Sequence, residues 1–441
     1  MVWEHQTSRS DIYCARVNQS GQVIDPLGIP VATAPGYQLF PRVAFDGTNY
    51  LVVWEDERNH AAGDLFGARL STAGSVLDPA GIPISIAPGD QVAPAVTWDG
   101  TRYVVVWQDS SGQDGSGYGI YGQRFTADGT PAGGEFRISE TTAGNQARPS
   151  FARLADGSYV IAWMSEVPNA YPFDAEICAR RYASDGTALG GEFRVNTYTT
   201  LDQGYPSVAA LPNGGYIVVW HSQGQDGDGY GVYGQRYAAS GAAIGGEFQV
   251  NTTTAEPQSV PTVAALPDGG FVVAWSSGYY NLGEADEDDR DICGQRFAAD
   301  GSPVGGEFRI NSYDAGDQEF VTIVTLADGG TLFAWNSDDP ATGESLIQGQ
   351  RFSADGSKFN ELTVTGTAGN DTLRGGDGTQ ILIGGAGDDT YEADLARDRI
   401  VEAAGGGRDT LRSWQSVVLP DVIEDLRLLG DADLDGTGNA S

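Results

Sequence analysis

Short apolar runs, each ending in a tryptophan, recur from the start of the chain to Trp335. The aligned positions are Trp3, Trp54, Trp107, Trp163, Trp220, Trp275 and Trp335. Their spacing of roughly 50 to 60 residues is typical of repeats that form propeller blades or solenoid turns. Before the last few dozen residues, no long stretch has the apolar spacing of a helix, so the pattern predicts an all-β chain.

Each full copy of the repeat reads as four short strands. In the copy that contains Trp220, the predicted strands cover residues 207–210, 216–220, 232–237 and 248–250. A tight turn at Asn213 and Gly214 joins the first two, and most other copies have an Asp-Gly pair there, which favours a hairpin. The strand that ends in tryptophan is apolar at nearly every position, which indicates that neither of its faces meets water.

Seven four-stranded antiparallel units predict a β-propeller over residues 1–361, because each blade buries both faces against its neighbours. A Gln-x-x-Pro motif marks the entry to the first strand of a copy. It begins at Gln38, Gln91, Gln146, Gln203 and Gln258, while Gln318 keeps the glutamine but is followed by Val321 in place of proline. Only six copies carry the motif. The first blade is therefore expected to be incomplete, or the chain to be part of a longer array.

An arginine closes the third strand of every copy. These residues are Arg16, Arg69, Arg124, Arg181, Arg236, Arg296 and Arg351. They could form an anion-binding ring or tie together loops and neighbouring blades. We favour the structural interpretation. The expected partners are Glu135, Glu192, Glu247 and Glu307 of the Gly-Gly-Glu-Phe turns.

Alternating strand direction places the loops before the first strand and after the second strand on one face of the propeller. These loops are long and variable, and variable loops on a rigid frame commonly carry binding sites. The candidate ligand-face residues are Asp114, Tyr118, Asp226, Asp228, Tyr230, Tyr279 and Tyr280. Aromatic rings beside carboxylates suit sugars, whose C–H patches stack on rings while their hydroxyls donate to acids. The alternative is that these residues only shape turns and pad the blade edge.

Acidic residues outnumber basic ones by 60 to 25, which gives a formal net charge of −35. Such a surface repels phosphate backbones and attracts divalent cations, so it argues against a nucleic-acid partner. No run of 18 apolar residues occurs, which argues against membrane insertion. Cys14, Cys178 and Cys293 lie in different copies on strands expected to be buried, so no disulfide is predicted.

From Gly366 the chain changes to three consecutive nonapeptides, GTAGNDTLR (366–374), GGDGTQILI (375–383) and GGAGDDTYE (384–392). They match the pattern G-G-x-G-x-D-x-U-x, and residues from about 366 to 441 resemble the hemolysin-type (RTX) calcium-binding repeat family, within an expected roll segment that covers residues 362–441. The resemblance implies a parallel β-roll that binds Ca²⁺, with two nonapeptides per turn, so Asp371 and Asp389 would share one metal site. Leu373, Leu382 and Tyr391 would point into the roll. Gln380 stands where Asp is expected, so the opposite side of the coil loses that carboxylate ligand. In the propeller, Asp226 and Asp228 could also hold Ca²⁺, although a full calcium-binding loop is missing there.

The resemblance also implies type I secretion through an uncleaved C-terminal signal, and therefore an extracellular or cell-surface location. Another repeat would begin at the last residues, so both ends are expected to be clipped. Three functions stay open: a binding module for glycans or a surface partner, a polysaccharide lyase or glycosidase, and a structural spacer in an adhesin-like chain. Only His5, His60 and His221 are present and no GxSxG or HExxH motif occurs, so no catalytic residue is assigned and binding is favoured over catalysis.

Overall fold

The computed structural model describes residues 1–6, 9–18, 23–25, 27–59, 63–113, 115–166, 174–278, 290–311, 316–338, 345–358, 362–367, 369–375, 380–393, 398–402, 406–414, 416–420, 422–429 and 435–438. Asp114, Tyr279 and Tyr280 of the predicted ligand face lie outside these residues. Within them every regular element is a β-strand, which confirms the all-β class. No helix long and apolar enough to cross a bilayer is found among the same residues.

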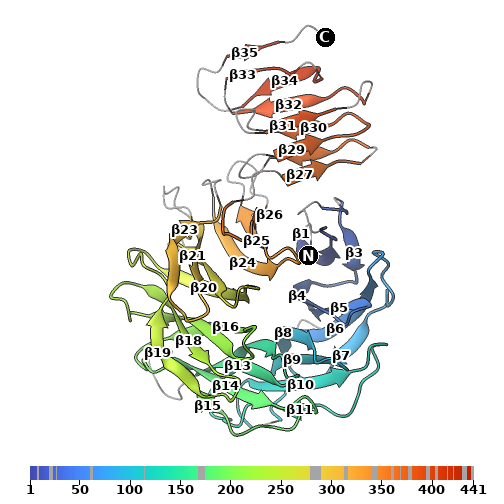
Figure 1. Cartoon of the computed structure of the whole chain (residues 1–441). Coiled ribbons are helices and arrows are strands. Elements are labelled where there is room, and N and C mark those ends of the chain that lie inside the picture. Colours follow the sequence, from blue (N-terminus) through green and yellow to red (C-terminus); the bar gives the residue numbers. More distant parts are fainter. Residues whose placement is uncertain are drawn as a thin grey trace.

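Seven antiparallel sheets follow one another along the described chain. Their strands are β1–β3 (Val2–Gln6, Ser10–Cys14, Ile29–Ala32), β4–β7 (Gln38–Phe45, Asn49–Asp56, Asp64–Ser71, Ile82–Ser85), β8–β11 (Gln91–Trp98, Tyr103–Asp109, Gly119–Phe125, Phe136–Arg137), β12–β15 (Gln146–Arg153, Tyr159–Glu166, Ala175–Tyr182, Phe193–Arg194), β16–β19 (Gln203–Ala210, Tyr216–Gln223, Tyr230–Tyr237, Ala243–Gln249), β20–β23 (Gln258–Ala265, Phe271–Ser277, Asp291–Phe297, Pro303–Arg309) and β24–β26 (Gln318–Thr325, Thr331–Asp338, Ser345–Phe352). Figure 1 shows them around a ring, from the blue N-terminal strands to the orange β24–β26. We number these sheets blades 1 to 7. They confirm the predicted propeller.

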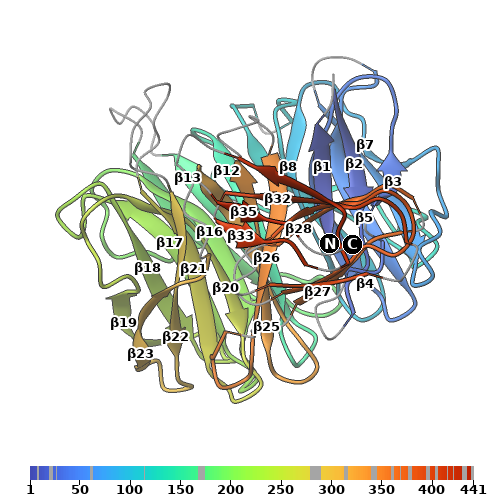
Figure 2. The ribbon, with the colours of Figure 1, turned by 90° about the horizontal axis from the view of Figure 1, so that it is seen from above.

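The first blade is incomplete, as the sequence predicts. In the part of the chain that the structure describes, blades 1 and 7 each hold three strands, and β1 pairs only with β2 within its sheet. In blades 2 to 7 the first strand packs against the first strands of neighbouring blades around the ring. We call β4, β8, β12, β16, β20 and β24 the inner strands. Figure 2, turned by 90°, shows the strands of neighbouring blades running alongside one another.

In blades 2 to 7 the second strand is buried on both faces, which explains its almost unbroken apolar sequence. Every residue of β17 from Tyr216 to Ser222 is buried. Ile217 and Val219 of this strand pack with Val273 and Trp275 of the next blade. The six tryptophans from blade 2 to blade 7 are at most 2% exposed. Burial between two neighbours therefore supplies the core of the propeller.

The Gln-x-x-Pro motif forms a β-bulge at the start of each inner strand. The third motif residue has a positive φ in all six copies: Phe40 (50°), Ala93 (52°), Arg148 (53°), Tyr205 (53°), Val260 (51°) and Phe320 (54°). The glutamine is fully buried, and the Gln203 amide donates to the carbonyls of Thr200 and Leu201 at 3.1 Å. The motif therefore fixes the entry of the chain into the blade, because a bulge re-aims the strand.

The repeated arginines have structural partners, but not the predicted glutamates. Arg16 and Arg69 pair with Asp25 and Asp78 of their own blades at 2.7 and 2.8 Å. Arg181 donates to the carbonyl oxygen of Ala239 in the next blade at 2.6 Å. The glutamates bind backbone instead: Glu192, Glu247 and Glu307 accept N–H groups of Thr141, Thr197 and Thr252 in the preceding blade. The fourth predicted partner, Glu135, accepts a hydrogen bond from Gln113 of its own blade at 3.2 Å.

A short parallel β-solenoid follows the propeller. Its strands are β27 (Leu362–Thr365), β28 (Thr372–Arg374), β29 (Gln380–Ile383), β30 (Thr390–Glu392), β31 (Arg399–Val401), β32 (Thr410–Ser413), β33 (Val417–Val418), β34 (Asp425–Leu428) and β35 (Gly436–Thr437). The larger ladders run β27-β29-β31 and β28-β30-β32-β34. Leu373, Leu382 and Tyr391 are 3%, 0% and 0% exposed inside the roll, as predicted. Figure 1 shows the roll in orange and red beyond β25 and β26.

Candidate metal centre and ligand face

Three turns of the roll stack on one side because the strands before and after them form parallel ladders. These turns follow β27, β29 and β31 and lead to β28, β30 and β32. Each ends in an aspartate. The backbone N–H of Asp371 donates to Asp389 Oδ1, and that of Asp389 donates to Asp409 Oδ1, both at 2.8 Å. The structure therefore brings Asp371 and Asp389 into adjacent turns on the same side of the roll.

Glu402 adds a fourth carboxylate to this column. One oxygen each from Asp389, Glu402 and Asp409 lies within 4.8 Å of the others. Asp389 is 1% exposed, and its Oδ2 has no hydrogen-bond partner. Burial and the nearby Asp371 and Asp409 raise the pKa of the Asp389 carboxyl. Oxygen ligands with concentrated negative charge fit a hard cation such as Ca²⁺, which would also remove the repulsion among them.

Glu402 was not found from the sequence. Gly366 follows β27, Gly384 follows β29, and Glu402 follows β31. Glu402 therefore stands at the first position of its turn, which glycine occupies in the other two turns. The hydroxyl of Tyr391 donates to its carboxylate. A side-chain carbon at Gly384 would overlap the carboxylates of Glu402 and Asp389. The available signal was an acidic residue at a turn position that glycine occupies in the other two turns.

The opposite side of the roll is less acidic in the nonapeptides, as predicted. Gln380 is buried, and its backbone N–H donates to Asp398 Oδ1 in the following turn at 3.0 Å. Asp398 is 6% exposed and lies outside the three nonapeptides. On this side the pair of stacked residues is Gln380 and Asp398, which supplies one carboxylate. The pair Asp371 and Asp389 on the other side supplies two, so a divalent cation finds fewer ligands here.

On the propeller, Tyr118 lines an open hollow with a volume of about 380 Å³. The hollow is otherwise lined by Ser110, Ser116, Asn145 and glycines of the same loop. The Tyr118 hydroxyl donates to Asp90 at 2.8 Å, and its backbone N–H donates to Asn145 Oδ1 at 3.0 Å. The ring is therefore held in place from two directions while it borders an open space.

Asp226, Asp228 and Tyr230 belong to the corresponding loop of blade 5. Asp226 accepts hydrogen bonds from the backbone N–H of Asp228 and from the Asn251 amide, at 3.3 and 3.4 Å. Tyr230 makes the same type of contact as Tyr118, with its hydroxyl donating to Asp202 at 3.5 Å. Among the described residues neither aspartate belongs to a cluster of potential metal ligands. These contacts agree with the turn-shaping interpretation.

His221 fills the space behind Tyr230. Its ring centroid lies 4.5 Å from that of Tyr230 and 5.0 Å from that of Tyr205. The Arg148 guanidinium covers the Tyr205 ring at 3.9 Å. His221 is 4% exposed, and burial lowers its pKa although Asp202 lies 3.7 Å from its Nε2. The imidazole is thus held neutral near pH 7. Tyr118 and Tyr230 lie two blades apart, so the structure does not bring the predicted face residues into one cluster.

Sequence reasoning also missed the residue that follows each aligned tryptophan. The Glu4 carboxylate accepts the Phe40 N–H at 2.7 Å, and the Glu55 carboxylate accepts the Ala93 N–H at 2.6 Å. Each contact joins one blade to the bulge of the next inner strand. Glu55 is 7% exposed, and its pKa is raised to about 7, mainly by burial and further by Glu4. Aligning the repeats and comparing the residue directly after each tryptophan would have revealed these two acids.

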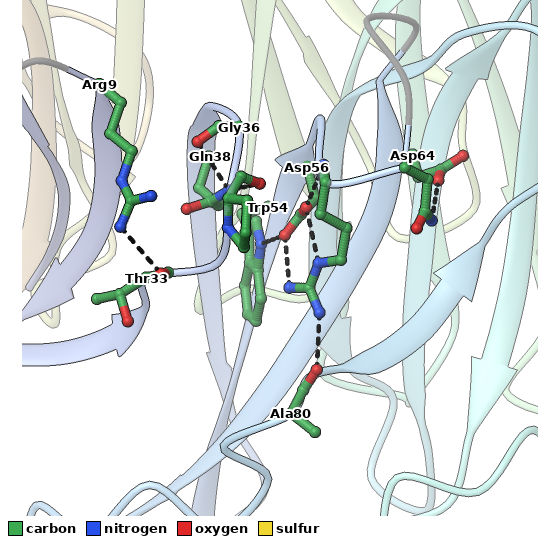
Figure 3. Close-up of polar contacts among 11 residues, drawn as sticks. Arg9, Thr33, Gly36, Gln38, Trp54, Asp56, Asp64 and Ala80 are labelled. Carbon is green, nitrogen blue, oxygen red and sulfur yellow. Dashed lines mark hydrogen bonds and ion pairs between the residues drawn. The ribbon is translucent and has the colours of Figure 1, made fainter.

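The residue two places past tryptophan anchors the indole in blades 2 and 3. Figure 3 shows Asp56 beside Trp54, whose Nε1 donates to Asp56 Oδ2 at 2.8 Å. The Arg58 guanidinium also pairs with this carboxylate at 2.6 Å and donates to the carbonyl oxygen of Ala80 at 2.7 Å. Asp56 is 0% exposed. Asp56 is therefore a structural residue, because both of its carboxylate oxygens accept hydrogen bonds from Trp54 or Arg58 within the same blade.

Residues 363–400 match the family described as the RTX calcium-binding nonapeptide repeat (4 copies). Over 80 residues the chain is 44% identical to endo-1,3-1,4-beta-glycanase ExsH of Rhizobium meliloti (strain 1021). Over 95 residues it is 37% identical to endo-1,3-1,4-beta-glycanase EglC of the same strain. The matches cover 18% and 20% of this chain, and 17% and 20% of those relatives. The chain thus corresponds to about a fifth of the length of each relative.

A solved structure resembles the propeller more broadly. It is a protein of unknown function from Dyadobacter fermentans DSM 18053, with a TM-score of 0.51 and 13% sequence identity. The match covers 71% of this chain and 94% of that chain. Identity this low concerns the fold alone. Residues 363–400 are therefore an RTX calcium-binding repeat segment, and a seven-bladed β-propeller precedes it.

Proposed function

We propose that the protein is a secreted or cell-surface calcium-binding protein whose propeller binds carbohydrate on its loop face. The observation that carries the proposal is the open hollow beside Tyr118. An aromatic ring can stack on the C–H face of a sugar, and the lining hydroxyl, amide and backbone groups can bond sugar hydroxyls. The two endo-glycanases that share a local stretch with this chain add support for a glycan ligand.

The roll supplies the calcium dependence of this proposal. Asp389, Glu402 and Asp409 would hold the ion, with Asp371 in the adjacent turn, and the buried, unpartnered Asp389 Oδ2 fits a ligand atom. A cation that binds the folded roll and not the unfolded chain stabilises the roll by mass action. RTX repeats are typical of secreted bacterial proteins, so a calcium-rich exterior would complete the fold after export.

A glycan array, probed with the full chain at millimolar Ca²⁺, tests the carbohydrate proposal. We expect a glycan whose binding is lost in Tyr118→Ala and kept in Tyr118→Phe, because the ring and not its hydroxyl faces the sugar. Tyr230→Ala is the matched control, since the same loop in blade 5 packs its ring on His221. No bound glycan for the wild-type chain would reject the proposal, and binding unchanged in Tyr118→Ala would reject this site.

One observation favours catalysis as the second candidate. Glu55 combines burial with a pKa raised to about 7, and Glu4 is the corresponding acid of the neighbouring blade. A carboxylic acid protonated near neutral pH can donate a proton to a glycosidic oxygen, with a second carboxylate as base or nucleophile. Release of reducing ends from a mixed-linkage β-glucan, abolished in Glu55→Gln, is the expected result. A rate equal to the buffer blank would remove this candidate.

A further inference from the structure

Blade 7 lacks an aromatic ring that blades 2 to 6 carry at one position of the second strand. Four places before the aligned tryptophan these blades have Tyr50, Tyr103, Tyr159, Tyr216 and Phe271, whereas blade 7 has Thr331. The last four of these aromatic residues are 0% exposed, and Thr331 is 6% exposed. A buried threonine is much smaller than a ring, so the side chains around it lose a packing partner.

Elsewhere this ring stacks on a second ring, which lies opposite it on the third strand. The stacked pairs are Tyr159–Tyr182 (5.2 Å between centroids, 14° between planes), Tyr216–Tyr237 (4.7 Å, 10°) and Phe271–Phe297 (4.9 Å, 12°). In blade 7 the opposite residue is Phe352. Its ring meets Phe308 and Phe333 at 52° and 76°. Thr331 offers it no ring to stack on.

A hollow with a volume of about 270 Å³ lies at this place. Thr331 and Phe352 of blade 7 line it, together with Leu266 and Val272 of blade 6. Leu266 is 3% exposed and Phe352 is 4% exposed, so these walls belong to the core between the two blades. An apolar cavity of about 150 Å³ can bind benzene. The hollow therefore has room for one aromatic ring that carries a substituent.

The walls of the hollow are the counterparts of residues that pack on a ring between blades 5 and 6. There Leu211 and Ile217 share a core cluster with Phe271. Leu211 corresponds to Leu266, and Ile217 corresponds to Val272, by their distance from the aligned tryptophan. The repeat thus built a ring-binding surface at blade 7 and left out the ring.

One wall also provides a hydrogen-bond donor. Arg296, which ends the third strand of blade 6, lines the hollow. Its counterpart Arg124 donates to the hydroxyl of Tyr159 in the next blade at 2.8 Å. Arg296 pairs with Asp268 at 2.9 Å, and Asp355 lines the hollow as well. These carboxylates would repel an anion, so the site favours a neutral hydroxyl over a carboxylate on the ring.

The hollow is open to solvent at one edge. Gly305 and Gly306 of blade 6 line it and are exposed. A side-chain carbon added at either glycine would meet no atom within 4 Å. Gly329, which also lines the hollow, precedes the second strand of blade 7, whereas the Tyr118 loop follows the second strand of blade 3. The two hollows therefore lie on opposite faces of the propeller.

We propose that this hollow binds a small phenol, a molecule with a single hydroxylated aromatic ring. The ring would take the place that Tyr159 and Tyr216 occupy in their own blades, stacked on Phe352. Its hydroxyl would accept a hydrogen bond from Arg296, as the Tyr159 hydroxyl does from Arg124. This site is separate from the proposed carbohydrate site and does not depend on it.

Saturation-transfer difference NMR with p-cresol, recorded on the full chain in Ca²⁺, tests the site. We expect saturable binding with a dissociation constant on the order of 1 mM, as suits a ligand of this size. Toluene, which lacks the hydroxyl, should bind roughly fivefold more weakly. N-acetyltyrosinamide should also bind more weakly than p-cresol, because the two glycines at the open edge have no side chains to hold a peptide backbone.

The variants fill or keep the hollow. Thr331→Tyr supplies the missing ring, so it should abolish p-cresol binding and raise the urea midpoint of unfolding. Thr331→Leu fills part of the space and should weaken binding, which keeps the test valid if the tyrosine variant does not fold. Thr331→Ser leaves the hollow and should bind as the wild type does. Thr187→Tyr, at an exposed turn residue of blade 4, is the matched control and should also bind normally.

Four outcomes would overturn the proposal. One is the absence of saturable p-cresol binding while circular dichroism shows a folded chain. Another is binding that survives both Thr331→Tyr and Thr331→Leu, which would place the ligand elsewhere. Toluene binding as tight as that of p-cresol would contradict the phenolic class. Tighter binding of N-acetyltyrosinamide would replace the small molecule with a tyrosine side chain of a partner protein.

Discussion

Replacing Glu55 with glutamine is expected to stabilise the propeller at pH 8 much more than at pH 5. Glu55 is 7% exposed, and its pKa rises from 4.5 to about 7 in the folded state, mainly because of burial. The folded carboxyl holds its proton more tightly than the unfolded one. Stability from this group is therefore fully present below pH 4.5 and is lost as the pH rises to about 7.

The size of the effect follows from that pKa difference. At about 1.4 kcal/mol per pKa unit, ionising buried Glu55 costs roughly 3 kcal/mol. Most of this cost appears between pH 5 and pH 8. The Glu55→Gln variant avoids it and keeps an oxygen that can accept the Ala93 N–H. We therefore expect its free energy of unfolding to exceed that of the wild type by roughly 3 kcal/mol at pH 8, and by under ~1 kcal/mol at pH 5.

Urea unfolding followed by tryptophan fluorescence at fixed Ca²⁺ measures the difference, because seven of the nine tryptophans lie at aligned propeller positions. Glu57→Gln, which removes the same charge from a partly buried neighbour, is the control and should change stability little at either pH. Equal effects of Glu55→Gln at the two pH values, or destabilisation at pH 8, would show that Glu55 is ionised in the folded protein. That result would also remove its role as a candidate proton donor.

Three further changes test other parts of the molecule. Asp389→Asn should weaken Ca²⁺ binding by ~10-fold or more in isothermal titration calorimetry of the full chain, since it removes charge from the ligand set, whereas exposed Asp228→Asn should not. Asp56→Asn should destabilise the propeller by about 2 kcal/mol in urea unfolding, because Arg58 loses a buried partner; no change would mean that the pair contributes nothing net. His221→Gln should reduce the loss of stability between pH 7 and pH 5. Burial lowers the folded pKa of this histidine below 6.5, so the unfolded chain binds more protons and the wild type is destabilised as the pH falls. Parallel pH profiles for both proteins would contradict this.

The blades were predictable because their signals are local and repeated. Burial on both faces requires an apolar second strand, which made each tryptophan run visible in the sequence. The glutamine and proline of the inner strand mark its bulge in the same way. Contacts between blades were not predictable by pairing nearby charges. Glu192 binds the neighbouring blade at Thr141, and Arg69 pairs with Asp78 of its own blade.

The roll shows the same division. The resemblance to the RTX repeats, in which two nonapeptides make one turn, implies that Asp371 and Asp389 stack. Glu402 lies outside the nonapeptides and enters the cluster only because β31 stacks on β29, so its place came from the tertiary structure.

The sequence by itself determined the all-β class, the seven repeats, the incomplete first blade and the calcium-binding roll. Each of these depends on the period of side chains along one strand or turn, which a linear pattern records. The tertiary structure alone decided which acids are buried and which loop borders a hollow. Those properties depend on distances between blades, and ring closure sets such distances through packing among residues 50 or more positions apart.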